Sequence, residues 1–227
     1  VALVRAAAQD SDVLFAARVS TQGERSLDDL DADPQRSKGL IGYLMRDRHG
    51  TPFEHSSMTF YVQAPIFVFR EFMRHRIASY NEESARYRQL QPVFYVPGPD
   101  RNLTQVGRPG HYEFCPGSAE QHALVAEQTR YVCTEAYAAY QRMLDAGVAR
   151  EVARIVLPLT IYSSMYVTLN ARSLMNFLSL RTRRPDARHP SFPQREIEMC
   201  AEQMETAWAG LMPLTHAAFN ENGRVAP

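Results

Sequence analysis

The segment Ser57–Tyr87, with the sequence SMTFYVQAPIFVFREFMRHRIASYNEESARY, contains the strongest indications of how this chain folds. Its first eight residues, 57–64, are rich in β-forming side chains and are followed by Pro65, so we expect a strand there. Proline suits the first turn of a helix, and the apolar run after it predicts a helix that begins at Pro65 and ends at Met73. Arg70 and Arg74 would share one face of that helix.

Helices and strands are expected on both sides of this segment without regular alternation. Apolar periodicity and capping residues predict helices over 11–19 with Ser11 as N-cap, 34–49 ended by Gly50, 119–146, 148–157, 171–181 and 194–212. Further strands are expected over 1–6 and 160–168, and polar or proline- and glycine-rich loops over 22–33, 97–117 and 182–193. This order favours an α+β fold, a single domain of residues 1–227 with a mixed or antiparallel sheet packed by long helices.

Bulk composition limits the classes of function. The chain has 227 residues, 45% of them hydrophobic and 22% charged, and its formal net charge is zero. Zero net charge argues against a nucleic-acid partner bound by bulk electrostatics. The longest apolar run, 64–69, is too short to span a bilayer, so no membrane partner is expected. Three cysteines without CxxC spacing indicate a reducing, cytoplasmic location and no zinc module.

The cationic cluster Arg74-His75-Arg76 stands out against this neutral background. Adjacent cations repel one another, and a fold usually accepts that cost where an anion such as phosphate binds. The alternative is a solvated basic helix end favoured by the helix dipole. The polar residues that follow it, with Ser84 and Arg86 among them, extend the polar stretch and favour a ligand site.

The segment 49–55, HGTPFEH, offers two histidines and a glutamate, which resembles a metal site in composition. The spacing fits no helical or strand pair of metal ligands, so no metal is expected. A sharp turn that presents Thr51 and Glu54 to a ligand is the more consistent reading.

Two helices carry arginines among apolar residues. Arg154 lies in the mostly apolar helix 148–157, where it either pairs with Glu151 or faces a ligand. Arg181 continues the apolar stripe of helix 171–181, and it either reaches water at the helix end or faces a ligand in a pocket. Arg172 and Asn176 share another face of that helix, and such groups can bind the edges of a heterocycle.

The run RHRIASYNEESARY resembles the signature of the flavin-dependent thymidylate synthases, in which Arg-His-Arg is followed after seven residues by Ser. HGTPFEH, FREFMRHR, REVARIVLP and NARSLMNFLSLR also occur in the family's order. Together these segments cover most of residues 10–197. The chain is therefore identified as a member of that family.

The resemblance implies a homotetramer of α+β subunits with active sites shared between protomers, FAD as cofactor and NADPH as its reductant. It implies reductive methylation of dUMP at carbon 5 with methylenetetrahydrofolate as carbon donor. The implied flavin contacts are Ser20, His49, Thr51, Glu54, Arg74, His75, Arg76, Ile77, Glu82, Asn170, Arg172 and Asn176. The implied nucleotide contacts are Glu71, Arg74, Glu82, Ser84, Ala85, Arg86, Arg154 and Arg181, the last polarising the uracil ring.

The chemistry of these residues agrees with that expectation. Uracil is a poor nucleophile, and a guanidinium against its imide edge stabilises negative charge there and raises electron density at carbon 5. No cysteine attack is then needed. Ser84 could be a nucleophile, but no histidine pattern suggests a triad, so a binding role is favoured.

The chain departs from the family after Arg181, where TRRPDARHPSFPQREIE is longer and more basic than in many members. Only Gln194 and Glu196 match there, and His189 is either a substitute contact or part of a loop. Glu71 stands where some relatives have Gln. Two alternatives to dUMP methylation stay open: the same chemistry on UMP in nucleoside-antibiotic biosynthesis, and a nucleotide- or RNA-binding protein that uses the same arginines.

Overall fold

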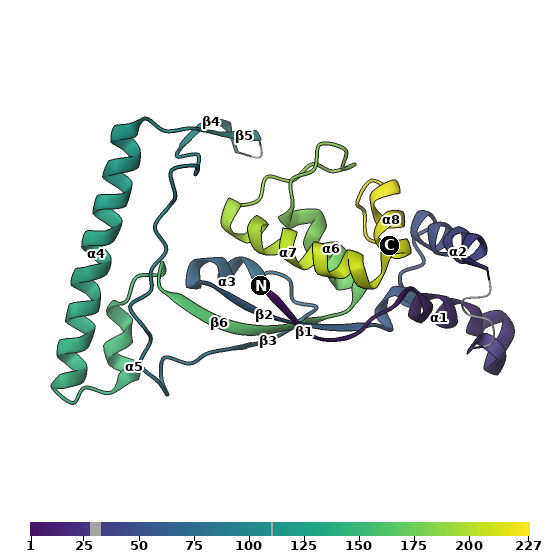
Figure 1. The fold of residues 1–227 in the computed structure, drawn as a ribbon, viewed down its shortest axis with the longest axis horizontal. Coiled ribbons are helices and arrows are strands. Elements are labelled where there is room, and N and C mark those ends of the chain that lie inside the picture. The colour runs from purple at the N-terminus through teal and green to yellow at the C-terminus, as the bar shows by residue number, and fades with distance from the viewer. Residues whose placement is uncertain (28–32, 110) are drawn as a thin grey trace. The chain divides into compact units, whose positions relative to one another are not determined.

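A computed structural model describes residues 1–27, 33–109 and 111–227 (Figure 1). Its α-helices are α1 (Asp10–Gln22), α2 (Pro34–Arg46), α3 (Ile66–Phe72), α4 (Ala119–Asp145), α5 (Arg150–Ala153), α6 (Ala171–Arg181), α7 (Arg195–Leu211) and α8 (Pro213–Glu221). Short 3-10 helices are η1 (Gly23–Leu27), η2 (Thr51–Glu54) and η3 (Arg154–Val156). The strands are β1 (Ala2–Ala7), β2 (Ser57–Pro65), β3 (Ser79–Glu82), β4 (Thr104–Arg108), β5 (His111–Cys115) and β6 (Tyr162–Leu169).

The strands form a four-stranded sheet in the order β1-β2-β6-β3 and a separate hairpin of β4 and β5. Strands β1 and β2 pair antiparallel, as do β4 and β5. In β2, Met58, Phe60 and Val62 are buried while the residues between them are more exposed. That alternation is expected of a strand with one face on the core. The combination of helices and an antiparallel sheet confirms the predicted α+β class.

The chain divides into two compact units. Unit 1 comprises residues 1–62, 72–81 and 166–227, and unit 2 comprises residues 63–71 and 82–165. Strands β2, β3 and β6 each begin in one unit and end in the other. The expectation of one domain over residues 1–227 stays a prediction.

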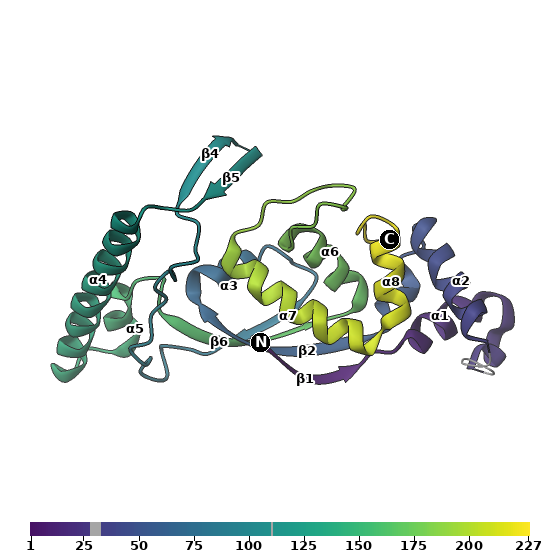
Figure 2. The same ribbon diagram turned by 45° about the horizontal axis from the view of Figure 1, so that its top comes forward.

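The core of unit 1 is built from helix α7 and its neighbours. Helix α7 packs against β1, α6 and α8, and Figure 2 shows α8 following it at its C-terminal end. Its buried stripe, spaced three or four residues apart, consists of Ile197, Ala201, Met204 and Trp208. This spacing places all four side chains on one helical face, so the apolar pattern of the sequence becomes the packing surface.

Unit 2 is organised around the long helix α4, which contacts α5 and η3. A small buried cluster of Ala85, Leu90 and Ile161 holds the segment after β3. Tyr137 of α4 donates to the Leu90 carbonyl at 3.0 Å, which ties that segment to the helix.

The predicted helices 119–146, 171–181 and 194–212 are confirmed within one or two residues, as are the strands 1–6, 57–64 and 160–168. Helix α1 begins earlier than predicted, and Ser11 is not its N-cap. The cap is Gln9, whose backbone N–H donates to the Asp12 carboxylate at 2.8 Å. The carboxylate of Asp12, in the first turn of the helix, thus accepts a hydrogen bond from the backbone N–H of the capping residue.

Helix α2 ends at Arg46, so Gly50 does not end it as predicted. The left-handed residue after the helix is Arg48, with φ of 64°. Gly50 has φ of −77° and precedes η2. The predicted loop 22–33 contains η1, and its residues 28–32 lie outside the described part of the chain.

The helix predicted from Pro65 to Met73 is shorter, because Pro65 is the last residue of β2 and α3 ends at Phe72. Arg74 lies beyond the helix, so the predicted stacking of Arg70 and Arg74 on one helical face is wrong. The helix predicted over 148–157 is also shorter, since α5 gives way to η3 at Arg154.

Residues 97–117 are not wholly a loop, because β4 and β5 pair within them. Gly107 has φ of 96°, and a Cβ there would meet the carbonyl of His111, so glycine is required. Residue 110 lies outside the described ranges. Helix α8 was also not expected. Its N-terminus is capped across the fold, since the Asp10 carboxylate accepts from the amides of Leu214 at 2.8 Å and Thr215 at 2.9 Å.

Candidate functional site

The residues expected to contact ligands fall into both units. Unit 1 holds Ser20, His49, Thr51, Glu54, Arg74, His75, Arg76, Ile77, Asn170, Arg172, Asn176 and Arg181. Unit 2 holds Glu71, Glu82, Ser84, Ala85, Arg86 and Arg154. The ligand role of each residue stays a prediction, and the surroundings of each set are described separately.

Helix α6 and the short helix η2 meet in unit 1 through Arg172. Its Nη1 donates to Glu54 Oε1 at 2.5 Å, and its Nε donates to the Pro227 carbonyl at 2.7 Å. A Cβ at Gly50 would collide with the Arg172 guanidinium. Gly50 therefore allows the Arg172 side chain to approach the backbone closely, and it does not end helix α2 as predicted.

Polar groups gather around this pair. The Asn170 side chain caps α6 by accepting from the Ser173 amide at 2.8 Å, and Asn176 donates to the Arg172 carbonyl at 3.2 Å. Thr51 and Glu54 are exposed on the short turn η2, as predicted, and their contact with a ligand stays a prediction.

Two of the expected flavin contacts, His49 and Ser20, interact with other residues of unit 1. The ring of His49, which is exposed, stacks on Tyr43 with centroids 5.5 Å apart. The Ser20 hydroxyl, on the exposed end of α1, donates to the Ala17 carbonyl at 3.0 Å. Neither contact buries the polar atoms, so both remain accessible to a ligand.

The segment between α3 and β3 carries the Arg-His-Arg cluster. Arg74 and Arg76 are exposed, and Ile77 is 78% exposed although it is a large apolar residue. The three residues follow the C-terminal end of α3 rather than lying within the helix. Ile77 directly follows these cations, and its contact with the flavin stays a prediction.

His75 differs from its two neighbours because it is half-buried and bound to Arg181. Arg181 Nε donates to His75 Nε2 at 3.0 Å, and the edge of the imidazole meets the ring of Phe177 with centroids 4.8 Å apart. Burial, and secondly the charge of Arg181, lower the pKa of His75 to about 4. The apolar stripe of α6 is thus confirmed, and Arg181 at its end is partly buried.

Unit 2 presents a separate group of charges. Arg86 Nε donates to Glu151 at 2.7 Å, and both side chains are about half exposed. Glu151 therefore pairs with Arg86, not with Arg154 as one reading of the sequence proposed. Arg88 pairs with Glu83 at 2.9 Å, and Glu83 also accepts from the Ser164 hydroxyl at 3.0 Å.

Glu82 begins this polar run in a half-buried position. Burial raises its pKa, while a hydrogen bond with Ser163 and the charge of Arg154 act in the opposite direction. The charge of Arg154 thus acts on the carboxylate of Glu82, and the Arg154–Glu151 pair that one interpretation of the sequence predicted does not form.

Ser84 and Ala85 shape the turn that follows. The Ser84 hydroxyl accepts from the Arg86 amide at 3.3 Å, and the Ala85 side chain is buried against Leu90 and Ile161. No histidine contact of Ser84 occurs in the described ranges 1–27, 33–109 and 111–227, which agrees with a binding role. Glu71 lies half-buried at the end of α3.

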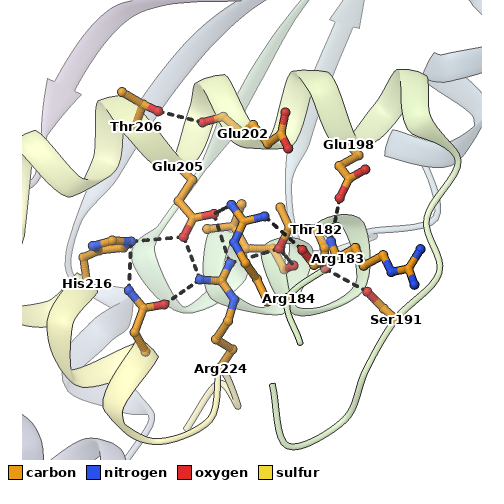
Figure 3. Close-up of polar contacts among 12 residues, drawn as sticks. Thr182, Arg183, Arg184, Ser191, Glu198, Glu202, Glu205, Thr206, His216 and Arg224 are labelled. Carbon is orange, nitrogen blue, oxygen red and sulfur yellow. Dashed lines mark hydrogen bonds and ion pairs between the residues drawn. The ribbon is translucent and has the colours of Figure 1, made fainter. Parts of the chain in front are cut away.

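Residues beyond Arg181 are anchored by a buried ionic cluster that sequence reasoning missed (Figure 3). Arg224 bridges both oxygens of Glu205, at 2.7 and 3.0 Å, and its Nη2 donates to the Thr182 hydroxyl at 3.0 Å. His216 also contacts Glu205 at 3.0 Å. Glu205 is buried on α7. A carboxylate among the apolar residues of that helix was the feature of the sequence that could have predicted a buried ion pair.

The loop after α6 has further ties to α7. The Arg183 amide donates to Glu198 at 2.7 Å, and Ser191 donates to the Thr182 carbonyl at 2.9 Å (Figure 3). His189 is exposed within this loop, whereas Glu196 is buried on α7. The loop that follows Arg181 is therefore fastened beside the end of α6.

Within the described residues, no cluster of three or more histidine, cysteine or acidic side chains has the arrangement of a metal site. The same part of the chain has no helix with the length and apolarity needed to cross a membrane. Cys115, Cys133 and Cys200 are free, and the last two are buried.

Comparisons with known proteins agree with the sequence signature. The family model described as "Thymidylate synthase complementing protein" matches residues 2–214. A flavin-dependent thymidylate synthase of Streptomyces coelicolor (strain ATCC BAA-471 / A3(2) / M145) is 70% identical over 228 residues, covering 100% of this chain and 93% of the relative.

Two solved structures of the UMP/dUMP methylase PolB from Streptomyces cacaoi are also similar. The one bound with 5-Br dUMP is 58% identical with a TM-score of 0.94, covering 99% of this chain and 96% of that one. The one bound with 5-Br UMP is 56% identical with a TM-score of 0.91, covering 100% and 96%.

Proposed function

This chain is an enzyme of the thymidylate synthase complementing protein family, the flavin-dependent thymidylate synthases, and we propose that it converts dUMP to dTMP. The proposed reaction is a reductive methylation at carbon 5, with FAD as cofactor, methylenetetrahydrofolate as carbon donor and NADPH as reductant. The proposal depends on one observation. In a chain that matches this family, the guanidinium of Arg181 at the end of α6 is hydrogen-bonded to His75.

The donor set of unit 1 fits a flavin dinucleotide. Arg74 and Arg76 are exposed cations able to bind a pyrophosphate, and Asn176 is an exposed amide able to bind a ring edge. The absence of a Cβ at Gly50 leaves room for the guanidinium of Arg172, a further cation of this unit. When bound, the flavin supplies the electrons that NADPH delivers, so the methylene carbon and a hydride together make the methyl group.

Arg181 is proposed to act on the uracil. Its guanidinium cannot lose a proton at neutral pH, so it offers a fixed positive charge and several donors to the imide edge. Negative charge at the imide edge is stabilised there, which raises the electron density at carbon 5 before it attacks the methylene donor. Because no side chain attacks carbon 6 in this scheme, the buried thiols of Cys133 and Cys200 have no catalytic role.

Arg86 and Arg154 are proposed to bind the nucleotide phosphate. The Arg86–Glu151 pair is half exposed and such pairs contribute about 0–1 kcal/mol, so a dianionic phosphate can replace the carboxylate. Ser84, Ala85, Glu71 and Glu82 are proposed to complete the sugar and phosphate contacts. The charge of Arg154, which acts on Glu82, would offset the repulsion between that carboxylate and the phosphate.

UMP is the second candidate substrate. The observation that favours it is the similarity to a methylase whose solved structures hold 5-Br dUMP in one case and 5-Br UMP in the other. One hydroxyl separates the two nucleotides, and a pocket rejects an added hydroxyl only modestly unless it is built to do so.

The test begins with the absorbance spectrum of the purified protein. Flavin bands that change on addition of dUMP are expected, and a colourless protein that releases no flavin on denaturation would contradict the proposal. Competition of dUMP and UMP in one assay then decides the substrate. If UMP is turned over as fast as dUMP or faster, dUMP is not the main substrate. Strong RNA binding by a protein without flavin would instead favour the nucleotide- or RNA-binding alternative.

Assembly and location complete the proposal. A homotetramer with active sites shared between protomers is proposed from the family resemblance, and sedimentation of the flavin-loaded protein tests it. A cytoplasmic location is proposed because Cys115, Cys133 and Cys200 are all free thiols.

A further inference from the structure

The contact between His75 and Arg181 defines the chemical state of the histidine. Arg181 Nε lies 3.0 Å from His75 Nε2 and donates to it. A guanidinium has donors only, so Nε2 is the unprotonated nitrogen and the ring proton is on Nδ1. A protonated imidazole would lose this hydrogen bond and place two cations in contact.

We propose that His75 is a positioning residue whose neutral ring accepts from Arg181 Nε and thereby orients the guanidinium toward the pyrimidine. The inference rests on the proposed function, and it gives His75 a role besides the flavin contact expected from the sequence. The bond uses the inner nitrogen of the guanidinium, and the terminal nitrogens Nη1 and Nη2 carry the donors suited to an imide edge.

The ring of His75 is itself held in place. Its edge packs on Phe177, which stacks on Phe72 with centroids 5.0 Å apart. The Tyr80 hydroxyl donates to the carbonyls of His75 at 2.8 Å and Phe72 at 2.7 Å. These contacts fix both the backbone and the ring, so the accepting nitrogen has a defined position.

The surrounding charges favour the neutral ring. Arg181 faces His75 from α6, Tyr80 contacts its backbone from β3, and Arg74 and Arg76 flank it in the chain. Burial and the Arg181 charge lower the pKa of His75 to about 4, and burial raises the pKa of Tyr80 to about 12. At neutral pH the ring is therefore an acceptor beside a phenol that keeps its proton.

The main chain at Arg181 is anchored from the other side. The Thr182 amide donates to the Leu178 carbonyl at 3.1 Å, and its hydroxyl accepts from Arg224. An arginine side chain has several rotatable bonds, and an anchored backbone alone leaves the guanidinium free to change rotamer. The bond to His75 restricts that freedom.

The first experiment observes the nitrogen atoms directly. Histidine labelled with ¹⁵N is incorporated, and the flavin-loaded enzyme is compared with its Arg181→Lys variant at neutral pH. We expect an unprotonated Nε2 in a hydrogen bond, with a shift in that resonance in Arg181→Lys. A protonated Nε2, or no response to the Arg181 substitution, would overturn the proposal.

The second experiment separates positioning from flavin binding. His75→Leu removes the acceptor and is expected to lower kcat per bound flavin by about 100-fold, as for loss of an oriented catalytic donor. His75→Gln offers a carbonyl acceptor and is expected to recover most of that loss. His122→Leu on α4 is the matched control, with kcat unchanged. Loss of flavin in His75→Leu with normal turnover per remaining flavin would overturn the proposal.

A double-mutant cycle provides the final criterion. If His75 acts through Arg181, His75→Leu costs much less in an Arg181→Lys background than in the wild type. Equal costs in both backgrounds would overturn the proposal. If the wild type forms no methylated nucleotide, the proposed function fails, and the nitrogen resonances still decide whether the ring accepts from Arg181.

Discussion

Arg224 and Glu205 form a bidentate ion pair inside unit 1, with contacts of 2.7 and 3.0 Å and side-chain exposures of only 4% and 9%. Such a pair is costly to bury but more costly to break, because the remaining charge is then left without a partner. Its position matters because Arg224 also binds Thr182, the residue after Arg181.

Arg224→Met is expected to lower the free energy of unfolding by about 3–5 kcal/mol, the range for breaking a buried pair. Urea unfolding followed by circular dichroism measures it. Lys38→Met is the control, since Lys38 pairs with Glu221 at 3.6 Å with both side chains more than half exposed. That substitution is expected to cost under about 1 kcal/mol. Equal costs would show that burial does not strengthen the Arg224 pair.

Glu205 is expected to make stability sensitive to acid. Burial would raise its pKa, but hydrogen bonds from His216 and Arg224 and the charges of Arg224 and Arg184 outweigh burial and lower it to about 2. The usual value is 4.5, so this stabilisation is complete above pH 4.5 and is lost as pH falls toward 2.

The measurement is urea unfolding of the wild type and Glu205→Gln across that pH range. The wild type is expected to lose stability on acidification more steeply, so the difference between the two proteins shrinks as the pH falls. Parallel curves would show that Glu205 has no depressed pKa in the folded state.

Arg181→Met is expected to lower kcat by about 10²–10³-fold, because it removes the positive charge that stabilises negative charge at the imide edge and so activates carbon 5. Flavin content is expected to stay unchanged. Arg183→Met, whose guanidinium stacks on Phe192 at 5.8 Å, is the control two residues away. Undiminished formation of methylated product by Arg181→Met would end the proposed mechanism.

Gly50→Ala is expected to weaken flavin retention, since the added Cβ would displace the Arg172 guanidinium. Equilibrium dialysis of FAD against the apo-protein measures the change in Kd. Gly42→Ala in α2 is the matched control, because nothing lies within 4 Å of the added Cβ. This control is expected to gain about 0.5–1 kcal/mol of stability and keep its FAD affinity. Equal FAD affinity in both variants would contradict a role for the Gly50–Arg172 approach.

Local sequence predicted those elements whose own residues carry the information. Helix α6 was predicted with its observed limits, because Asn170 caps it and its apolar residues keep helical spacing. Strand β2 was predicted from its β-forming residues and from Pro65, which follows the predicted strand 57–64. Helix α8 was missed because its cap, Asp10, lies about two hundred residues earlier in the chain.

The amino-acid order was sufficient for the α+β class, the family and the identity of the chemical groups, because residue type and short-range periodicity are local properties. It could not pair His75 with Arg181, 106 residues apart, or Glu205 with Arg224 in a buried cluster. Those partners follow from how the helices pack, and burial then sets the charge of each group. A histidine that reads as a cation beside two arginines is consequently a neutral acceptor in the folded protein.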